Sequence, residues 1–182
     1  EFENLNYDIR IALKDMLDMF VVKARRKHLE FNCKIDPDVP SWVIGDPGRL
    51  KQIIINLTEN AFKFTEKGHV FITVTVKKET ETDIILFFEI EDTGIGIPQN
   101  QLEKIFQSFS RADSSSLREF GGIGLGLTIS KQLVELMKGN MGVKSEEGKG
   151  TTFWFELILK KQQIQDEMNV KKDISFADKS IL

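Results

Sequence analysis

Two amides and an ammonium recur at helical spacing in the stretch QIIINLTENAFKFT, from Gln52 to Thr65. At ~100° per residue, Asn56, Asn60 and Lys63 fall on one narrow stripe of a helix, roughly 100° from the centre of its apolar face. Hydrogen-bonding groups at the rim of a buried face are placed where the wall of a groove would lie. An ordinary solvated helix side is an equally good interpretation of this helix alone.

Local signals predict that this stretch is helical. Asp46 can cap the free amides of the first turn, and Pro47 suits the first helical position, where no donor is needed. The apolar residues keep the spacing of one helix face. They are Leu50, Ile53, Ile54, Leu57, Ala61 and Phe64.

A first glycine cluster, EDTGIGIP, follows a predicted strand. Asp92 lies at the strand end, and Gly94 and Gly96 allow the backbone to approach a ligand closely. A carboxylate here could accept a hydrogen bond from an exocyclic amine such as that of adenine. A tight turn with Asp92 as a local cap is the alternative.

Two further glycine clusters lie later in the chain. GGIGLGL, from Gly121 to Leu127, opens a predicted helix to about Lys138, whose free amides would favour an anion. Its buried face is predicted to hold Leu125, Ile129, Leu133, Leu136 and Met137. EEGKGTTF reads as a turn that leads into a strand with hydroxyls at Thr151 and Thr152, although a plain hairpin would look the same. The spacings match neither a Rossmann fingerprint nor a P-loop.

The region between these clusters divides into two parts. Pro98 to Gln107 predicts a short helix, and the serine-rich stretch from Ser110 to Phe120 predicts a mobile loop of the lid kind. Arg111 and Arg118 are its cations and could reach a phosphate, or could simply be solvated.

Composition excludes several classes of protein. The 182 residues are 41% hydrophobic and 29% charged, which is typical of a soluble globular domain. A net charge of −3 gives no general attraction for nucleic acid, and one cysteine with two histidines makes a structural zinc site unfavourable. No apolar run approaches the ~20 residues needed to cross a bilayer. We therefore expect no membrane contact, no nucleic-acid partner and a cytoplasmic location, with any anchor elsewhere in a parent protein.

The order of elements predicts an α+β fold, a two-layer sandwich with helices on one face of a mixed, mostly antiparallel sheet. A helix to about His28 is followed by an alternating strand at Leu29–Ile35, a short strand at Trp42–Ile44 and the central helix. Strands at His69–Lys78 and Ile84–Glu91 come next, and those at Met141–Ser145 and Thr151–Leu159 follow the last helix. Glu1 to Asn6 is expected to be frayed.

Taken together, these motifs closely resemble the catalytic, ATP-binding domain of sensor histidine kinases, which shares the Bergerat fold with DNA gyrase, mismatch-repair ATPases and a heat-shock chaperone. The resemblance covers about Asp8 to Lys160. It implies a catalytic domain at residues 1–161 that binds ATP and Mg²⁺ and passes phosphate to a histidine.

The resemblance also implies roles for individual residues. Asn56 and Asn60 would be catalytic amides, with Asn60 the Mg²⁺ ligand; Lys63 would contact phosphate and Phe64 would flank the purine. Asp92 would read adenine, with Thr151 or Thr152 helping through a water. The remaining nucleotide-binding positions would be Gly94, Gly96, Phe106, Phe109, Arg118, Gly122, Gly124, Leu125, Gly126 and Gly150, with Gly148 beside them in the third glycine cluster.

Asn56 favours transfer to histidine over hydrolysis. The gyrase-like ATPases carry a glutamate at this position, and an amide cannot take a proton from water near neutral pH. A neutral imidazole already has a lone pair and needs less help. Glu59 is the nearest carboxylate, but its direction lies roughly 60° beyond the amide stripe, which predicts a solvated side chain.

The phosphoacceptor motif of a whole kinase is absent, since neither His28 nor His69 has the expected acidic and proline neighbours. We therefore expect a separate histidine phosphoacceptor and dimerisation domain as partner, a monomeric fragment and a homodimeric parent. Residues 162–182 predict a polar linker ending in Lys179-Ser-Ile-Leu182, which resembles the opening strand of a response-regulator receiver domain, cut short. The rival functions are an ATPase without kinase activity and a nucleotide-gated or degenerate interaction module.

Overall fold

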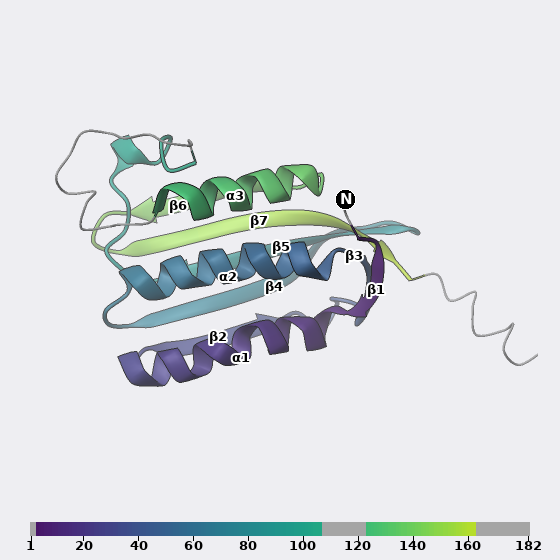
Figure 1. Cartoon of the computed structure of the whole chain (residues 1–182), viewed down its shortest axis with the longest axis horizontal. Coiled ribbons are helices and arrows are strands. Elements are labelled where there is room, and N and C mark those ends of the chain that lie inside the picture. The colour runs from purple at the N-terminus through teal and green to yellow at the C-terminus, as the bar shows by residue number, and fades with distance from the viewer. Residues whose placement is uncertain (1–2, 107–122, 163–182) are drawn as a thin grey trace, which may run out of the picture.

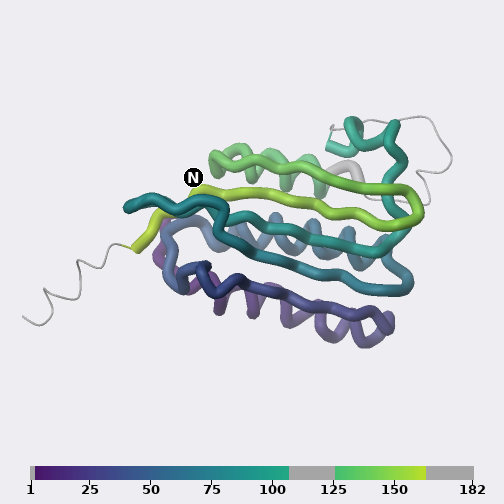
Figure 2. The backbone as a smooth tube through the Cα atoms, turned by 180° about the vertical axis from the view of Figure 1, so that it is seen from behind, coloured from purple at the N-terminus to yellow at the C-terminus, as the bar shows by residue number. Residues whose placement is uncertain are grey.

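The computed structural model describes residues 3–106 and 123–162, with the backbone alone at 123–125. Three α-helices cover one face of a sheet, and Figures 1 and 2 show this two-layer arrangement from its two sides. The helices are α1 (Ile9–Lys27), α2 (Pro47–Phe64) and α3 (Ile123–Leu136). The predicted α+β sandwich is confirmed.

The sheet has seven strands within the described part of the chain. Six of them are hydrogen-bonded in the order β1-β3-β7-β5-β4-β2, and the seventh, β6, pairs with β7. Only the β2–β4 pairing is parallel among these; the others are antiparallel. The strands are β1 (Leu5–Asp8), β2 (Glu30–Ile35), β3 (Trp42–Gly45), β4 (His69–Glu79), β5 (Asp83–Asp92), β6 (Asn140–Glu146) and β7 (Gly150–Lys161).

The core lies between the helices and the sheet because the strands alternate. Inward residues of β5 and β7 are almost fully buried, and Phe88 stacks on Phe155 with ring centroids 4.5 Å apart. Under α1 and α2, Phe62 packs against Phe20 at 5.4 Å and Phe31 at 5.3 Å. This apolar layer fixes α2, the helix that carries the amide stripe, over β4 and β5.

The start of α2 is tied to the first strand of the chain. One carboxylate oxygen of Asp46 accepts from the Arg49 amide at 2.9 Å, and the other accepts from the Glu3 amide at 3.1 Å. The residue is 5% exposed. Asp46 therefore satisfies a free helix amide and holds the segment that precedes β1.

Replacing Asp46 with alanine is expected to destabilise the domain by about 1–2 kcal/mol, because both amides lose their buried acceptor. Urea unfolding followed by circular dichroism measures this change. Asp46→Asn keeps one amide oxygen as an acceptor and should cost less than half as much; equal costs for the two variants would contradict a capping role.

Four sequence predictions need correction. Leu5 and Asn6 begin strand β1 rather than fraying, because they pair with Gly45 and Ile44. The helix predicted from Pro98 is only a three-residue 3₁₀ turn, Gln99–Gln101, followed by further turns. Ile129 and Leu136 are exposed rather than buried, at 36% and 61%. Phe64, predicted on the buried face, is half-buried.

None of the helices in the described ranges is both long and apolar enough to span a membrane.

Candidate functional site

The sequence-predicted residues that the structure describes gather at one end of the sandwich. In Figure 1 the end of α2, the end of β5, the β6–β7 turn and the start of α3 all lie at the left. Specific contacts join them. The Ile95 amide donates to the Phe64 carbonyl at 3.3 Å, and the Gly148 amide donates to the Ile95 carbonyl at 2.7 Å. The end of α2 and two glycine turns thus form one structural unit.

One residue of the amide stripe of α2, Asn56, contacts α3. Asn56 Nδ2 lies 3.4 Å from the Gly126 carbonyl and 3.3 Å from Ser130 Oγ, donating to both. A Cβ on Gly126 would lie 3.8 Å from Asn56 Cγ, so the first turn of α3 rests directly over this amide. The predicted helix start at the second glycine cluster is confirmed, since α3 begins at Ile123.

The other two residues of the amide stripe differ in exposure. Asn60 is half-buried, while Lys63 is exposed with its ammonium 5.3 Å from the ring centre of Phe64. From α1, Lys27 Nζ donates to the Phe62 and Thr65 carbonyls, at 2.5 and 3.0 Å. A cation therefore satisfies the last carbonyls of α2 from a neighbouring helix, which holds this end of the stripe in place.

Asp92 is a buried carboxylate at the last position of β5, only 5% exposed. Burial raises the pKa of Asp92 to about 6, with a smaller push from the charge of Glu91 and an opposing effect of the Gly94 and Thr151 amides. The Gly94 amide donates to Asp92 Oδ1 at 2.8 Å. One carboxylate oxygen is thereby fixed by the turn.

The turn after Asp92 depends on glycine. Gly96 has a φ of +70°, and a Cβ there would overlap the Glu146 carbonyl of the neighbouring turn. Gly94 is equally confined, since a Cβ would overlap the Phe64 carbonyl at the end of α2. The close approach of three backbone segments is therefore what these glycines permit.

Gly96→Ala is expected to destabilise the domain by about 2–4 kcal/mol. The alanine would have to adopt a left-handed backbone conformation, and its Cβ would clash with the Glu146 carbonyl. Gly148→Ala is the matched control: its φ is +80°, but nothing lies within 4 Å of its Cβ position. That variant should cost only about 1 kcal/mol. Chemical unfolding of both proteins measures the difference. Similar losses in the free energy of unfolding would mean that the contact between Gly96 and the Glu146 carbonyl is not what requires glycine.

The sheet register distinguishes the two threonines of the third glycine cluster. Thr151 pairs with Asp92 across β5 and β7, whereas Thr152 pairs with Glu91. Directly paired residues project to the same face of a sheet, so Thr151 lies beside Asp92 on the helix side and Thr152 lies on the opposite side. Thr151 is 6% exposed, and its hydroxyl lies 2.8 Å from Ser145 Oγ.

Sequence reasoning missed Ser145 and Thr65. The Ser145 hydroxyl accepts from the Ile97 amide at 2.8 Å, and the buried Thr65 hydroxyl donates to the Ala61 carbonyl at 2.7 Å. Both are single polar residues with no periodic signal, so only their position beside Thr151 and Asp92 distinguishes them.

Several predicted residues have a packing role or cannot be placed. The ring of Phe106 packs edge-on against Phe153 at 6.3 Å, and Lys131 Nζ lies 5.2 Å from its centre. Gly124 and Leu125 belong to the first turn of α3 by their backbone. Phe109, Arg111, Arg118 and Gly122 lie outside the described residues, as do the predicted lid and the tail from residue 163.

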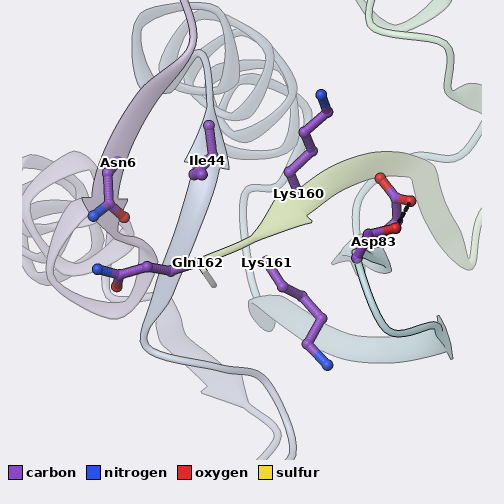
Figure 3. A pocket seen from close by; sticks show the side chains of 7 residues that line it. Asn6, Ile44, Asp83, Lys160, Lys161 and Gln162 are labelled. Atoms are coloured by element: carbon purple, nitrogen blue, oxygen red, sulfur yellow. Dashed lines mark hydrogen bonds between the residues drawn. The ribbon is translucent and has the colours of Figure 1, made fainter. Parts of the chain in front are cut away.

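A hollow lies at the opposite end of the sandwich from the described site residues. Its volume of ≈ 650 Å³ would admit a nucleotide. Figure 3 shows Asn6, Ile44, Asp83, Lys160, Lys161 and Gln162 around it. Lys161 is already paired there, with Glu79 at 2.6 Å. None of the predicted site residues lines this hollow, so it is a separate feature of the surface.

Comparison with known proteins places this geometry in a family. Residues 45–161 match the family described as histidine kinase-, DNA gyrase B-, and HSP90-like ATPase. Sensor histidine kinase GacS of Pseudomonas protegens is 42% identical over 159 residues, covering 87% of this chain and 17% of that protein. Hybrid signal transduction protein dokA of Dictyostelium discoideum is 41% identical over 160 residues, covering 85% of this chain and 10% of that protein.

Among solved structures, full-length ShkA in complex with AMPPNP superposes with a TM-score of 0.72 at 32% identity, covering 86% of this chain and 31% of that one. This chain belongs to the histidine kinase-, DNA gyrase B- and HSP90-like ATPase family, and it corresponds to the catalytic, ATP-binding part of sensor histidine kinases. It spans about a sixth of the length of GacS.

Proposed function

We propose that this domain binds Mg-ATP between α2, the Asp92 turn and the start of α3, and transfers the γ-phosphate to a histidine on a separate phosphoacceptor domain. One observation carries the proposal. The buried Asp92 carboxylate, held by the Gly94 amide, closes strand β5 at the end of the fold where α2, the helix that carries Asn56, Asn60 and Lys63, also ends. A carboxylate that can accept from the amine of adenine, together with a polar stripe that can contact the phosphates, suits an adenine nucleotide.

In this proposal the base end of the nucleotide lies against Asp92. The ionised carboxylate accepts from the exocyclic amine of adenine, and Thr151, rather than Thr152, assists because it lies on the same face. Phe64 flanks the purine at the end of α2. The amides of the first turn of α3 favour the phosphate groups, since a helix start attracts anions.

The phosphate end lies along α2 in the same proposal. Asn60 offers an amide oxygen, a hard ligand that suits Mg²⁺. This ion takes few protein ligands, and phosphate and water oxygens would fill the rest of its coordination shell. The ion would neutralise charge on the phosphate oxygens during transfer. No described cluster of three or more His, Cys, Asp or Glu residues competes for this ion. Lys63, exposed beside Phe64, supplies a cation for the phosphates.

The structure of Asn56 supports histidine as the acceptor. Its amide is bonded to Gly126 and Ser130 of α3 and has no proton-accepting nitrogen, so it cannot activate water. Glu59, the nearest carboxylate, is exposed as the sequence predicts. The acceptor imidazole instead brings its own lone pair: a nitrogen–phosphorus bond forms, the bond to the β-phosphate oxygen breaks, and ADP leaves.

The acceptor histidine belongs to another domain in this proposal. His28 caps α1 with a φ of 54°, and His69 lies 3.2 Å from Glu91 on the face away from Asp92. We further propose that the parent protein is a homodimeric hybrid kinase with a receiver domain, and that this domain lies in the cytoplasm. The relative dokA, whose name describes a hybrid signal transduction protein, favours the hybrid organisation.

A transfer assay tests the proposal. The chain is incubated with γ-labelled Mg-ATP, with and without the phosphoacceptor domain of its parent. We expect acid-labile label on that domain and none on this chain. Steady release of inorganic phosphate by this chain alone, or label on His28 or His69, would overturn it.

A further inference from the structure

One hydroxyl joins the two turns on either side of Thr151. Ser145, on β6, has three oxygen or nitrogen neighbours at 2.8 Å: the Ile97 amide, the Gly150 carbonyl and Thr151 Oγ1. Ile97 belongs to the turn that begins at Asp92, and Gly150 precedes Thr151 at the start of β7. Ser145 thus contacts both sides of the proposed adenine site without being part of it.

Counting protons fixes the direction of each bond. The Ile97 amide can only donate, and the Gly150 carbonyl can only accept. Two oxygens at 2.8 Å repel unless a proton lies between them, so the single hydroxyl proton of Ser145 must point to Gly150. Ser145 then has two lone pairs, one for the Ile97 amide and one for a donor on Thr151. The Thr151 hydroxyl therefore gives its proton to Ser145.

The consequence concerns what Thr151 offers to a ligand. With its proton held by Ser145, Thr151 Oγ1 presents only lone pairs toward its neighbour Asp92. An ionised Asp92 also presents only acceptors. A pair of acceptors complements a base that carries a hydrogen-bond donor at this position, either directly or through one water, and opposes a carbonyl.

We infer that Ser145 is a positioning residue for base selection, which holds the Thr151 hydroxyl as an acceptor so that the site prefers 6-aminopurine nucleotides over 6-oxopurine nucleotides. This inference rests on the proposed function, since it assumes that Asp92 and Thr151 contact the base. Ser145 itself touches no nucleotide. It acts through the proton of Thr151.

The test measures the affinities of the whole chain for Mg-ATP and for Mg-ITP, whose base carries a carbonyl in place of the amine. In Ser145→Ala the Thr151 proton is free to turn toward the ligand. We expect ATP affinity to fall about tenfold, ITP affinity to stay level or rise, and the ATP-to-ITP ratio to drop at least about tenfold. An equal loss for both nucleotides, or an unchanged ratio, would overturn the inference by leaving Ser145 a structural role only.

Two further variants complete the design. Ser145→Thr keeps the hydroxyl and should restore most of the wild-type ratio. Thr151→Val removes the acceptor without supplying a donor, so ATP affinity should fall with no gain for ITP, and full retention of the wild-type ratio would also overturn the inference. If the wild-type chain binds neither nucleotide, the proposed function fails; if it prefers ATP and Ser145→Ala keeps that preference, only this inference fails.

Discussion

Asp92→Asn should lower the affinity for adenine nucleotides by about 100-fold while making the empty domain more stable. The Gly94 amide holds Oδ1, so the asparagine oxygen takes that place and its NH₂ group replaces the other oxygen. A donor then faces the donor amine of adenine. Loss of a hydrogen bond to a charged group, with a donor opposed to a donor, is worth roughly 3 kcal/mol. Calorimetric titration with Mg-ADP measures it.

The gain in stability follows from the pKa of Asp92. Burial raises that pKa to about 6, above its ordinary value of 3.8, so the folded chain holds the proton more tightly than the unfolded chain. The stability contributed by the protonated form is complete below pH ~4 and is lost as the pH rises through ~6. At pH 7.5 the ionised carboxylate therefore destabilises the empty domain, and asparagine removes a cost on the order of 1–3 kcal/mol.

Unfolding of both proteins at pH 5 and pH 7.5 checks this sign. The asparagine variant should exceed the wild type at pH 7.5 and lose about half of that advantage at pH 5, where the unfolded chain is still ionised. Nucleotide affinity of the wild type should in turn decline below pH 6, as the carboxylate takes up its proton. Glu91→Gln, at the exposed neighbouring position, is the control and should bind normally. A variant less stable than the wild type at pH 7.5 would contradict the burial argument.

Asn60→Ala is expected to reduce phosphoryl transfer on the order of 10³-fold with little effect on metal-free ADP binding. The amide is proposed to hold Mg²⁺, so its loss removes electrostatic stabilisation that matters most during transfer. Alanine favours a helix, and Asn60 lies within α2, so the fold should be kept. The measurement pairs the transfer assay, at saturating ATP, with ADP titration in a chelator.

Glu59→Gln provides the matched control on the neighbouring residue. Glu59 is exposed and has no assigned role, so transfer should stay within about twofold of the wild type. If Glu59→Gln lost as much activity as Asn60→Ala, the base would be Glu59 and the assignment along α2 would be wrong. If Asn60→Ala bound metal-free ADP as poorly as Mg-ATP, the amide would serve the nucleotide rather than the ion.

The elements that carry strong local patterns were predictable from the sequence. Helix α2 combines a cap at Asp46, a proline at the first turn and a continuous apolar stripe. Five of the six residues predicted on its apolar face are buried; Phe64 is half-buried, and the buried Thr58 and Phe62 were not predicted. The strands of the central sheet alternate over ten residues or more, which also predicts their inward faces.

Features that depend on distant partners were not predictable. β1 is four residues long and is a strand only because it pairs with β3, so LNYD has no signal of its own. Ile129 and Leu136 share the helical spacing of α3 with buried residues, but periodicity does not reveal how far a neighbouring layer extends over a helix. They remain at its open side.

The candidate site divides in the same way. Glycine turns and Asp92 have recognisable types and spacing, so the sequence alone proposes them as site residues. The choice between Thr151 and Thr152 depends on the pairing of β5 with β7, and the sequence holds no record of that register. Ser145 could be recognised only once two turns were seen to meet at its hydroxyl.

A nitrogen-15 NMR titration with Mg-ATP tests most directly whether one cavity joins these residues. We expect the backbone amides of Gly94 and Thr151 and the side-chain amide of Asn60 to shift together, with a single dissociation constant, while Asn6 and Lys161 at the far hollow stay unchanged. Shifts that centre on Asn6 and Lys161, or that yield different constants for Asn60 and Gly94, would contradict a shared nucleotide site.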